Sequence, residues 1–269
     1  MKKIVTTLSF AGALLAAPLA ATAAPMIVNW DYTVTTNWVP SATQFNSQTA
    51  GTTTVSPTVI SWGATGGDYT NQSAGPLDAR SALVISNTPA TGTAITNGAI
   101  EDTSLITHYN NILDNRFKTL TRTELITTLT LNANPGGGAP AGSPFSKTFN
   151  VEFIETANTD PCFAASSGTI PCDDIFVLGL NNLLDSFMFE GVKYNVQIIG
   201  NLGLLPDSAC LAAGAPTGCF GLQTHEAAIT TAPFAFRITA QIPEPGILAL
   251  LGIGLAGVGF ASRRRSSAV

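Results

Sequence analysis

The sequence has few charged residues and hardly any histidine. Charged side chains make up 11% of its 269 residues, and there are two histidines. It also lacks a G-x-S-x-G nucleophile elbow, an H-E-x-x-H zinc motif and a glycine-rich P-loop ending in Lys-Ser or Lys-Thr. With no familiar set of catalytic residues in the chain, we expect a protein that is not an enzyme.

Long apolar runs occur at the two ends of the chain. At the start, two lysines precede an apolar segment at 4–20, and small residues follow at 21–23. A charged beginning, an apolar middle and small residues before the cut are typical of a secretory signal peptide. We therefore predict a signal peptide at residues 1–23, cleavage by signal peptidase after Ala23, and export across the inner membrane.

The other end has three parts in order: a proline-glutamate-proline break, an uncharged apolar run at 246–261, and an arginine cluster. The residues of the break and the cluster are Pro243, Glu244, Pro245, Arg263, Arg264 and Arg265. As a helix the apolar run would span about 24 Å, less than the roughly 30 Å of a membrane's hydrocarbon core. We predict a transmembrane helix that serves as a transient anchor, with the arginines on the cytoplasmic side.

This terminal combination resembles the PEP-CTERM sorting signal of Gram-negative bacteria. The resemblance implies that an exosortase, a membrane protease, recognises residues 243–269 and removes the helix. It also implies a destination at the cell surface or outside the cell, and an association with exopolysaccharide or biofilm. The alternative is an ordinary C-terminal membrane anchor.

Basic residues are scarce between the two terminal signals. Residues 24–242 contain seven Lys and Arg against sixteen Asp and Glu, a formal charge of −9. A surface with so few cations offers little to the phosphates of nucleic acid or anionic lipid. We expect no nucleic-acid partner, and 219 residues suffice for one sizeable exported domain.

The composition of this domain favours strands over helices, because Thr, Ser, Asn, Gly and Pro are common and Lys and Glu are rare. Apolar residues alternate with polar ones at 28–34, 125–131, 145–153 and 234–239, and residues 190–191 predict a hairpin turn. We predict an all-β domain, a two-sheet β-sandwich of jelly-roll-like type, between the signal helix and the sorting helix.

All four cysteines lie in the exported domain: Cys162, Cys172, Cys210 and Cys219. An even number of cysteines outside the cytoplasm indicates disulfides. Of three pairings we favour Cys162 with Cys172 and Cys210 with Cys219, since each pair brackets a loop of small residues. A metal site is the alternative, but there is no C-x-x-C pair and the histidines lie elsewhere in the sequence.

The most distinctive stretch of the domain is Thr107-His108-Tyr109-Asn110-Asn111. His108 could be a metal ligand, a general base or a contact for a sugar. We favour a structural histidine whose ring holds a loop to neighbouring backbone, with the two asparagines capping a turn. The T-H-x-N pattern of Thr107, His108 and Asn110 resembles the signature of the THxN family of PEP-CTERM proteins. That family has no assigned activity, so the resemblance implies classification and export rather than a mechanism.

Acidic residues supply the remaining candidates. Asp173-Asp174 precedes an apolar stretch, a place where a calcium-binding loop could lie, although such pairs are commonly just solvated. We predict no metal or other cofactor, with Asp173 and Asp174 as the candidates if calcium binds. Together with His108, His225 and Glu226 they could instead serve a metal-dependent hydrolase or lyase acting on extracellular polysaccharide. A calcium-stabilised carbohydrate-binding module is a further alternative.

Two other residue sets bear on carbohydrate. Glycosidase chemistry needs two carboxylates at a set distance, but Glu152 and Glu155 lie three positions apart in one predicted strand and should face opposite sides. Trp30, Trp38 and Trp62 could stack on sugars, but we expect them to fill the core. We therefore predict an exported, non-enzymatic protein of the cell surface or extracellular matrix.

Overall fold

The computed structural model describes residues 26–159, 162, 172–179, 183–241, 252 and 254–255. The predicted signal peptide and almost all of the predicted sorting tail, including both of its motifs, lie outside these residues. Within the described part of the chain, no helix combines the length and apolar character needed to cross a membrane. Met26–Gln241 form one compact unit, which we call the body.

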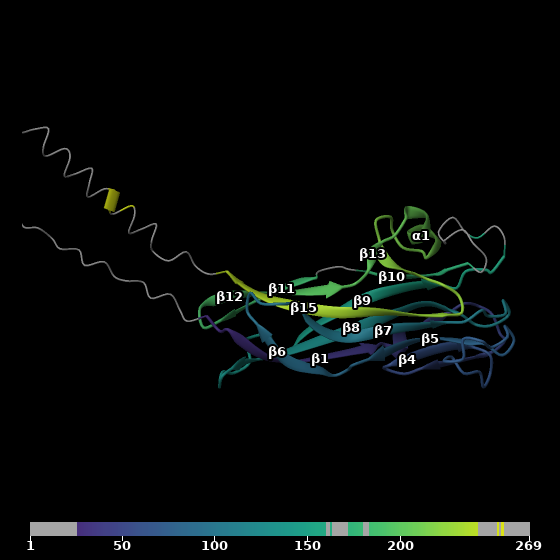
Figure 1. Ribbon diagram of the computed structural model, residues 1–269, viewed down its shortest axis with the longest axis horizontal. Coiled ribbons are helices and arrows are strands. Elements are labelled where there is room, and N and C mark those ends of the chain that lie inside the picture. Colours follow the sequence, from purple (N-terminus) through teal and green to yellow (C-terminus); the bar gives the residue numbers. More distant parts are fainter. Residues whose placement is uncertain are drawn as a thin grey trace, which may run out of the picture. The chain divides into compact units, whose positions relative to one another are not determined.

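The body consists of two antiparallel β-sheets (Figure 1). One sheet has the strand order β13-β14-β10-β9-β8-β1-β6, with β2 also paired to β8; the other has the order β11-β12-β15-β7-β5-β4-β3. The eight-stranded sheet contains β1 (Asn29–Trp38), β2 (Gln44–Phe45), β6 (Ala90–Ile95), β8 (Leu120–Asn134), β9 (Phe145–Ile154), β10 (Asp174–Leu178), β13 (Gly203–Leu204) and β14 (Phe220–Thr224). The seven-stranded sheet contains β3 (Thr52–Val55), β4 (Val59–Gly63), β5 (Arg80–Ser86), β7 (Glu101–Asn110), β11 (Leu184–Phe189), β12 (Val192–Gly200) and β15 (Ala228–Gln241). The all-β prediction is confirmed, while the jelly-roll comparison stays a prediction.

The alternating sequence pattern corresponds to strands with one buried face. In β1, Trp30, Tyr32 and Val34 are buried, whereas Asp31 between them is exposed. The predicted hairpin joins β11 to β12. Its turn residues Glu190 and Gly191 have φ values of +48° and +79°, the left-handed conformations that a tight two-residue turn requires.

The hydrophobic core lies between the two sheets. One apolar cluster contains Trp38 of β1 and Trp62 of β4, and a second contains Trp30 of β1 and Tyr194 of β12. Each cluster draws on both sheets, so the sheets pack face to face as a sandwich. Trp30, Trp38 and Trp62 are at most 1% exposed. The tryptophans therefore fill the core, as expected, and offer no stacking surface for sugars.

A short helix, α1 (Asp207–Ala212), covers part of the outer face of the eight-stranded sheet (Figure 1). It packs with Ile175 and Val177 of β10, which explains why every residue of that strand is buried. The disulfide between Cys210 and Cys219 ties the helix to the start of β14. We expected no helix in this domain, because six residues without a side-chain cap leave almost no periodic pattern.

Candidate functional site

Three carboxylates from separate parts of the chain meet inside the body. Glu155 directly follows β9, Asp174 begins β10, and Glu226 lies in the turn between β14 and β15. One carboxylate oxygen of each lies within 4.8 Å of the other two, and no other group of three such ligand side chains occurs in the described ranges. The sheet order explains the meeting, because β10 pairs with both β9 and β14 and the relevant strand ends coincide. We call Glu155, Asp174 and Glu226 the carboxylate cluster.

Each member of the cluster accepts one hydrogen bond through one of its two oxygens. The bonds run from Trp62 Nε1–H to Glu155 Oε2 (3.0 Å), from the Thr156 backbone N–H to Asp174 Oδ1 (2.9 Å), and from Asn158 Nδ2–H to Glu226 Oε1 (2.6 Å). The second oxygens, Glu155 Oε1, Asp174 Oδ2 and Glu226 Oε2, are buried without a protein donor. An ionised carboxylate can only accept hydrogen bonds, so these oxygens need a proton, a cation or a donor that is not part of the protein.

Burial raises the pKa of all three carboxyl groups. Burial raises the pKa of Glu155 to about 7, and the hydrogen bond from Trp62 opposes the change only in part. That of Glu226 rises to about 9, through burial and then the charge of Glu155. The pKa of Asp174 lies well above its usual range, through burial and the charges of the other two. Without a cation, the cluster therefore retains protons near neutral pH, and Glu155 and Asp174 can share one.

The T-H-x-N stretch braces the strand end that carries this cluster. It forms the end of β7 in the opposite sheet, and two of its side chains contact Thr224, the last residue of β14. His108 Nδ1 lies 2.8 Å from Thr224 Oγ1, and Asn110 Nδ2 donates to the Thr224 carbonyl at 2.9 Å. Thr224 is the sheet partner of Asp174, and its hydroxyl donates to the Asp174 carbonyl at 3.4 Å. Thr107 faces outward and shares a hydroxyl contact of 3.0 Å with Thr231.

His108 has a structural environment. The side chain is 2% exposed, its ring stacks on Trp62 at 6.0 Å and meets the ring of Phe153 edge-on at 5.2 Å. Burial lowers the pKa of the imidazole to about 3, so the ring is neutral and a weak base. The expected buried, hydrogen-bonded role agrees with this geometry. The expected loop and backbone partner were wrong, because the ring lies on a strand and binds a side-chain hydroxyl.

The two histidines do not assemble a metal site with the acidic residues. His225 is 74% exposed and its Nδ1 lies 2.6 Å from Asp173 Oδ1, whereas Asp174 belongs to the cluster. Neither histidine belongs to the carboxylate cluster. The combined histidine–carboxylate ligand set was therefore wrong.

The sequence analysis named Asp174 and Glu226 as candidate metal ligands, but it did not name Glu155 as one. Glu155 was placed inside a strand, but β9 ends at Ile154, and no local pattern marks the residue that follows. Glu152 pairs with Arg122 at 3.4 Å, whereas Glu155 accepts from Trp62, so the two glutamates have separate partners.

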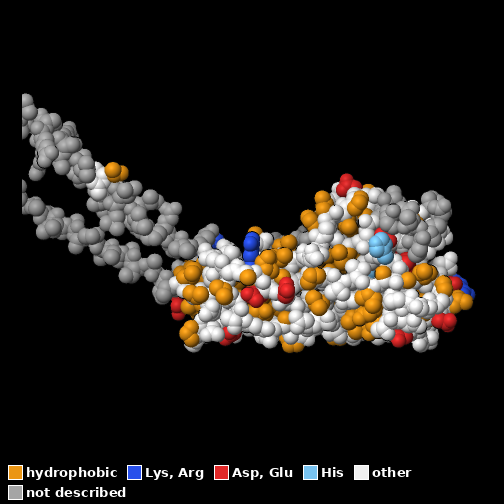
Figure 2. All heavy atoms as spheres, in the orientation of Figure 1, with side chains coloured by type: hydrophobic (Ala, Val, Ile, Leu, Met, Phe, Trp, Pro, Cys, Tyr) orange, Lys and Arg blue, Asp and Glu red, His pale blue; other side chains and the backbone are white. Residues whose placement is uncertain are grey.

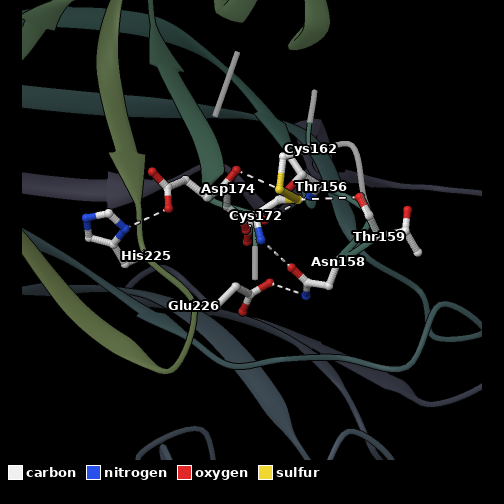
Figure 3. The surroundings of a disulfide bond; sticks show 9 residues. Thr156, Asn158, Thr159, Cys162, Cys172, Asp174, His225 and Glu226 are labelled. Atoms are coloured by element: carbon white, nitrogen blue, oxygen red, sulfur yellow. Dashed lines mark hydrogen bonds and ion pairs between the residues drawn. A yellow bond between two sulfur atoms is a disulfide. The ribbon is translucent and has the colours of Figure 1, made fainter. Parts of the chain in front are cut away.

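Both disulfides have the favoured pairing, Cys162–Cys172 and Cys210–Cys219. The first lies beside the carboxylate cluster (Figure 3). The Cys172 backbone N–H donates to Asn158 Oδ1 at 2.8 Å, and the same asparagine donates to Glu226. This disulfide therefore holds the residue that orients one carboxylate.

Comparison with known families concerns the end of the chain rather than the body. Residues 241–265 match the model of the PEP-CTERM protein-sorting motif. The chain carries a PEP-CTERM sorting signal. The match contains the predicted proline-glutamate-proline break and all three arginines of the cluster. It supports an exported protein that an exosortase processes at the membrane. The curated proteins include no significant match to the chain. The THxN resemblance lies outside the matched residues and stays a prediction.

Proposed function

We propose that this chain is an exported, non-enzymatic protein of the cell surface or extracellular matrix of a Gram-negative bacterium. Signal peptidase would remove one end and an exosortase the other, and the body would be the delivered product. The observation that carries the proposal is the PEP-CTERM motif at 241–265. Two disulfides in the body suit an oxidising compartment.

Exopolysaccharide is the partner that we propose. The body presents mostly uncharged polar and apolar side chains on the face in Figure 2, with scattered acidic groups and few basic ones. Cross-strand hydroxyls line the outward side of the eight-stranded sheet, where Thr33 of β1 is the partner of Thr91 on one side and Thr130 on the other. Such a face supplies hydrogen-bond donors and acceptors without ionic attraction, which suits a neutral or weakly charged polysaccharide.

The test of the sorting proposal is processing in a host that contains an exosortase. Mass spectrometry of the surface and secreted fractions should find the wild-type chain without residues 1–23 and without its arginine tail. Replacing the three arginines at 263–265 by glutamine should leave the tail attached and the chain in the membrane fraction. A matched control replaces three cations of the body, Arg116, Lys118 and Lys193, by glutamine and should be processed normally. A wild-type chain that stays in the inner membrane with its tail intact would overturn the proposal.

A second candidate function is a calcium-stabilised carbohydrate-binding module. The observation that favours it is the carboxylate cluster, whose three partnerless oxygens could take a cation. Co-sedimentation of the processed protein with host exopolysaccharide, in calcium and in chelator, separates the two ideas. Binding that disappears in chelator supports the module. Binding that is equal in both supports the first proposal.

A further inference from the structure

We propose that Glu155, Asp174 and Glu226 form a binding site for a divalent cation of the calcium type, and that the cation completes the body after export. The site is independent of the sorting signal and of any polysaccharide partner. It is built entirely from described residues at one end of the sandwich.

The first argument is the orientation of the ligands. An N–H donor holds one oxygen of each carboxylate, and the other oxygen of each has no hydrogen-bond donor in the protein. Outer hydrogen bonds of this kind are what orient the ligands of a metal site. Calcium lies about 2.3–2.6 Å from its oxygens, so two ligands of one ion are at most about 5 Å apart. The mutual distances of 4.8 Å or less satisfy that limit.

The side chain of Asn110 contributes a fourth buried oxygen without a partner near this strand end. Asn110 is completely buried, and its Oδ1 has no hydrogen-bond partner. Its Nδ2 is held by the carbonyl of Thr224, the sheet partner of Asp174. Amide oxygens are ordinary calcium ligands. The T-H-x-N stretch therefore braces the strand end that carries the cluster, and it has one buried amide oxygen without a partner.

The second argument is charge. The ion pairs found among the described residues are Arg116–Asp114, Arg122–Glu152, Lys147–Asp185 and His225–Asp173. None of them involves a cluster member, and no lysine or arginine is among the groups that lower the pKa values of the cluster. Burying several carboxylates without a compensating charge is strongly unfavourable. A divalent cation supplies the missing positive charge.

The ligand chemistry selects the kind of cation. All candidate ligands are oxygens, and neither histidine nor any cysteine belongs to the group. Zinc and copper favour nitrogen and sulfur, whereas calcium and magnesium favour oxygen. Magnesium keeps several waters and demands a near-ideal octahedron, while calcium accepts irregular cages of protein oxygens. A buried cluster assembled from separate loops and strand ends therefore suits calcium.

A hollow in the surface reaches one member of the cluster. It has a volume of about 400 Å³, and its lining includes Glu155, Thr156, Asn158, Leu113 and Phe117. Glu155 is a ligand candidate, and Asn158 holds Glu226. Calcium modules outside cells bind in the range of about 10⁻⁴–10⁻³ M. We expect an affinity of that order, so the site would fill only after export.

The experiment titrates the oxidised full chain, in detergent micelles, with calcium chloride and follows thermal unfolding. The apparent Tm should rise with calcium concentration and return to its starting value in EDTA. Terbium, which takes calcium sites, adds a direct readout, because the Trp62 indole contacts Glu155 and can sensitise its emission. Excess calcium should displace terbium and quench that emission.

Two variants and a control locate the site. Asp174→Asn and Glu226→Gln should abolish the calcium-dependent rise in Tm while unfolding in EDTA at least as high as the wild type, because each removes a buried charge. Glu152→Gln, three positions from Glu155 but paired with Arg122, should keep the full calcium response. A folded wild type whose melting ignores millimolar calcium and that gives no sensitised emission overturns the proposal. Melting that responds to pH but not to calcium also overturns it, since the cluster is then a proton-sharing set only.

Discussion

Two sets of buried ionisable side chains in the body differ in how many hydrogen-bond partners the protein gives them. Arg80, at the start of β5, is 6% exposed, and its five N–H groups make seven hydrogen-bond contacts, some of them shared, all to neutral oxygens. Its acceptors are backbone or hydroxyl oxygens of Thr52, Thr54, Ser61 and Ala64. In the carboxylate cluster, each of three acidic side chains has one held oxygen and one with no partner.

The two sites differ in how far the protein satisfies the hydrogen-bonding groups that it buries. Around Arg80 the protein replaces the lost water by its own acceptors, so the guanidinium stays charged even though burial lowers its pKa. Only three of the cluster's six carboxylate oxygens receive a hydrogen bond from the protein. Arg80 therefore has a structural role that needs nothing from outside, whereas three oxygens of the cluster have no partner in the protein.

The largest effect should come from Arg80→Met. This variant keeps much of the side-chain volume and removes every hydrogen bond of the guanidinium at once. A buried hydrogen bond to a charged group contributes about 1.5–3 kcal/mol, so the free energy of unfolding should fall by at least about 3 kcal/mol. Urea denaturation measures the change.

The matched control for this variant is Arg116→Met. That arginine is 66% exposed and pairs with Asp114 at the surface, so the loss should be much smaller than in Arg80→Met. If both variants lose the same stability, the hydrogen bonds of buried Arg80 stabilise the fold no more than an exposed ion pair does. A calcium response should persist in Arg80→Met, provided that it folds.

The next effect concerns the brace between the sheets. His108→Ala removes a buried ring that contacts Thr224 and packs on Trp62, and should lower the free energy of unfolding by about 1–3 kcal/mol. His225→Ala should change it by no more than about 0.5 kcal/mol, because that ring is largely exposed. Thermal and urea unfolding of the two variants compare them directly. Equal, negligible losses would mean that His108 does not support the strand end of the cluster.

The sequence predicts more of the fold than of the candidate site. Alternating polarity encodes which face of a strand is buried, and Glu190-Gly191 encodes a turn, so the strands and one hairpin were found. The apolar stretch after Asp173 forms the buried strand β10, and packing of α1 against one of its faces explains why both faces are covered. The helix α1 is stabilised by tertiary packing and a disulfide, neither of which leaves a periodic signal.

The cluster could be predicted only in part, because it depends on long-range pairing. Asp174 and Glu226 were named as candidate ligands because they lie close in sequence to Cys172 and His225. What brings them together with Glu155 is the order of β9, β10 and β14 in one sheet, and single-sequence patterns do not determine that order. The neighbouring pair Asp173 and Asp174 illustrates the limit, since one binds an exposed histidine and the other enters the buried cluster.

The smallest effect should appear in the pH dependence of stability in EDTA. The folded pKa values of Glu155 (about 7) and Glu226 (about 9) exceed the ordinary value of 4.5, so between pH 4.5 and 9 the folded chain binds more protons than the unfolded chain. Their contribution to stability therefore falls as pH rises through that window. His108 acts with the opposite sign between pH 3 and 6.5, because burial lowers its pKa. The window from pH 6.5 to 9 isolates the carboxylates.

Within that window the wild type in EDTA should lose at least about 1 kcal/mol as the pH rises, since one pKa unit corresponds to about 1.4 kcal/mol. Glu226→Gln should lose less, because glutamine does not titrate, whereas Glu190→Gln at the exposed hairpin turn should follow the wild type. The readout is the difference between variant and wild type in urea denaturation at each pH. Saturating calcium should flatten the wild-type slope, because a bound cation keeps the carboxylates ionised in the folded state. If Glu226→Gln matches the wild-type slope in EDTA, Glu226 does not hold a proton in the folded state within this pH window.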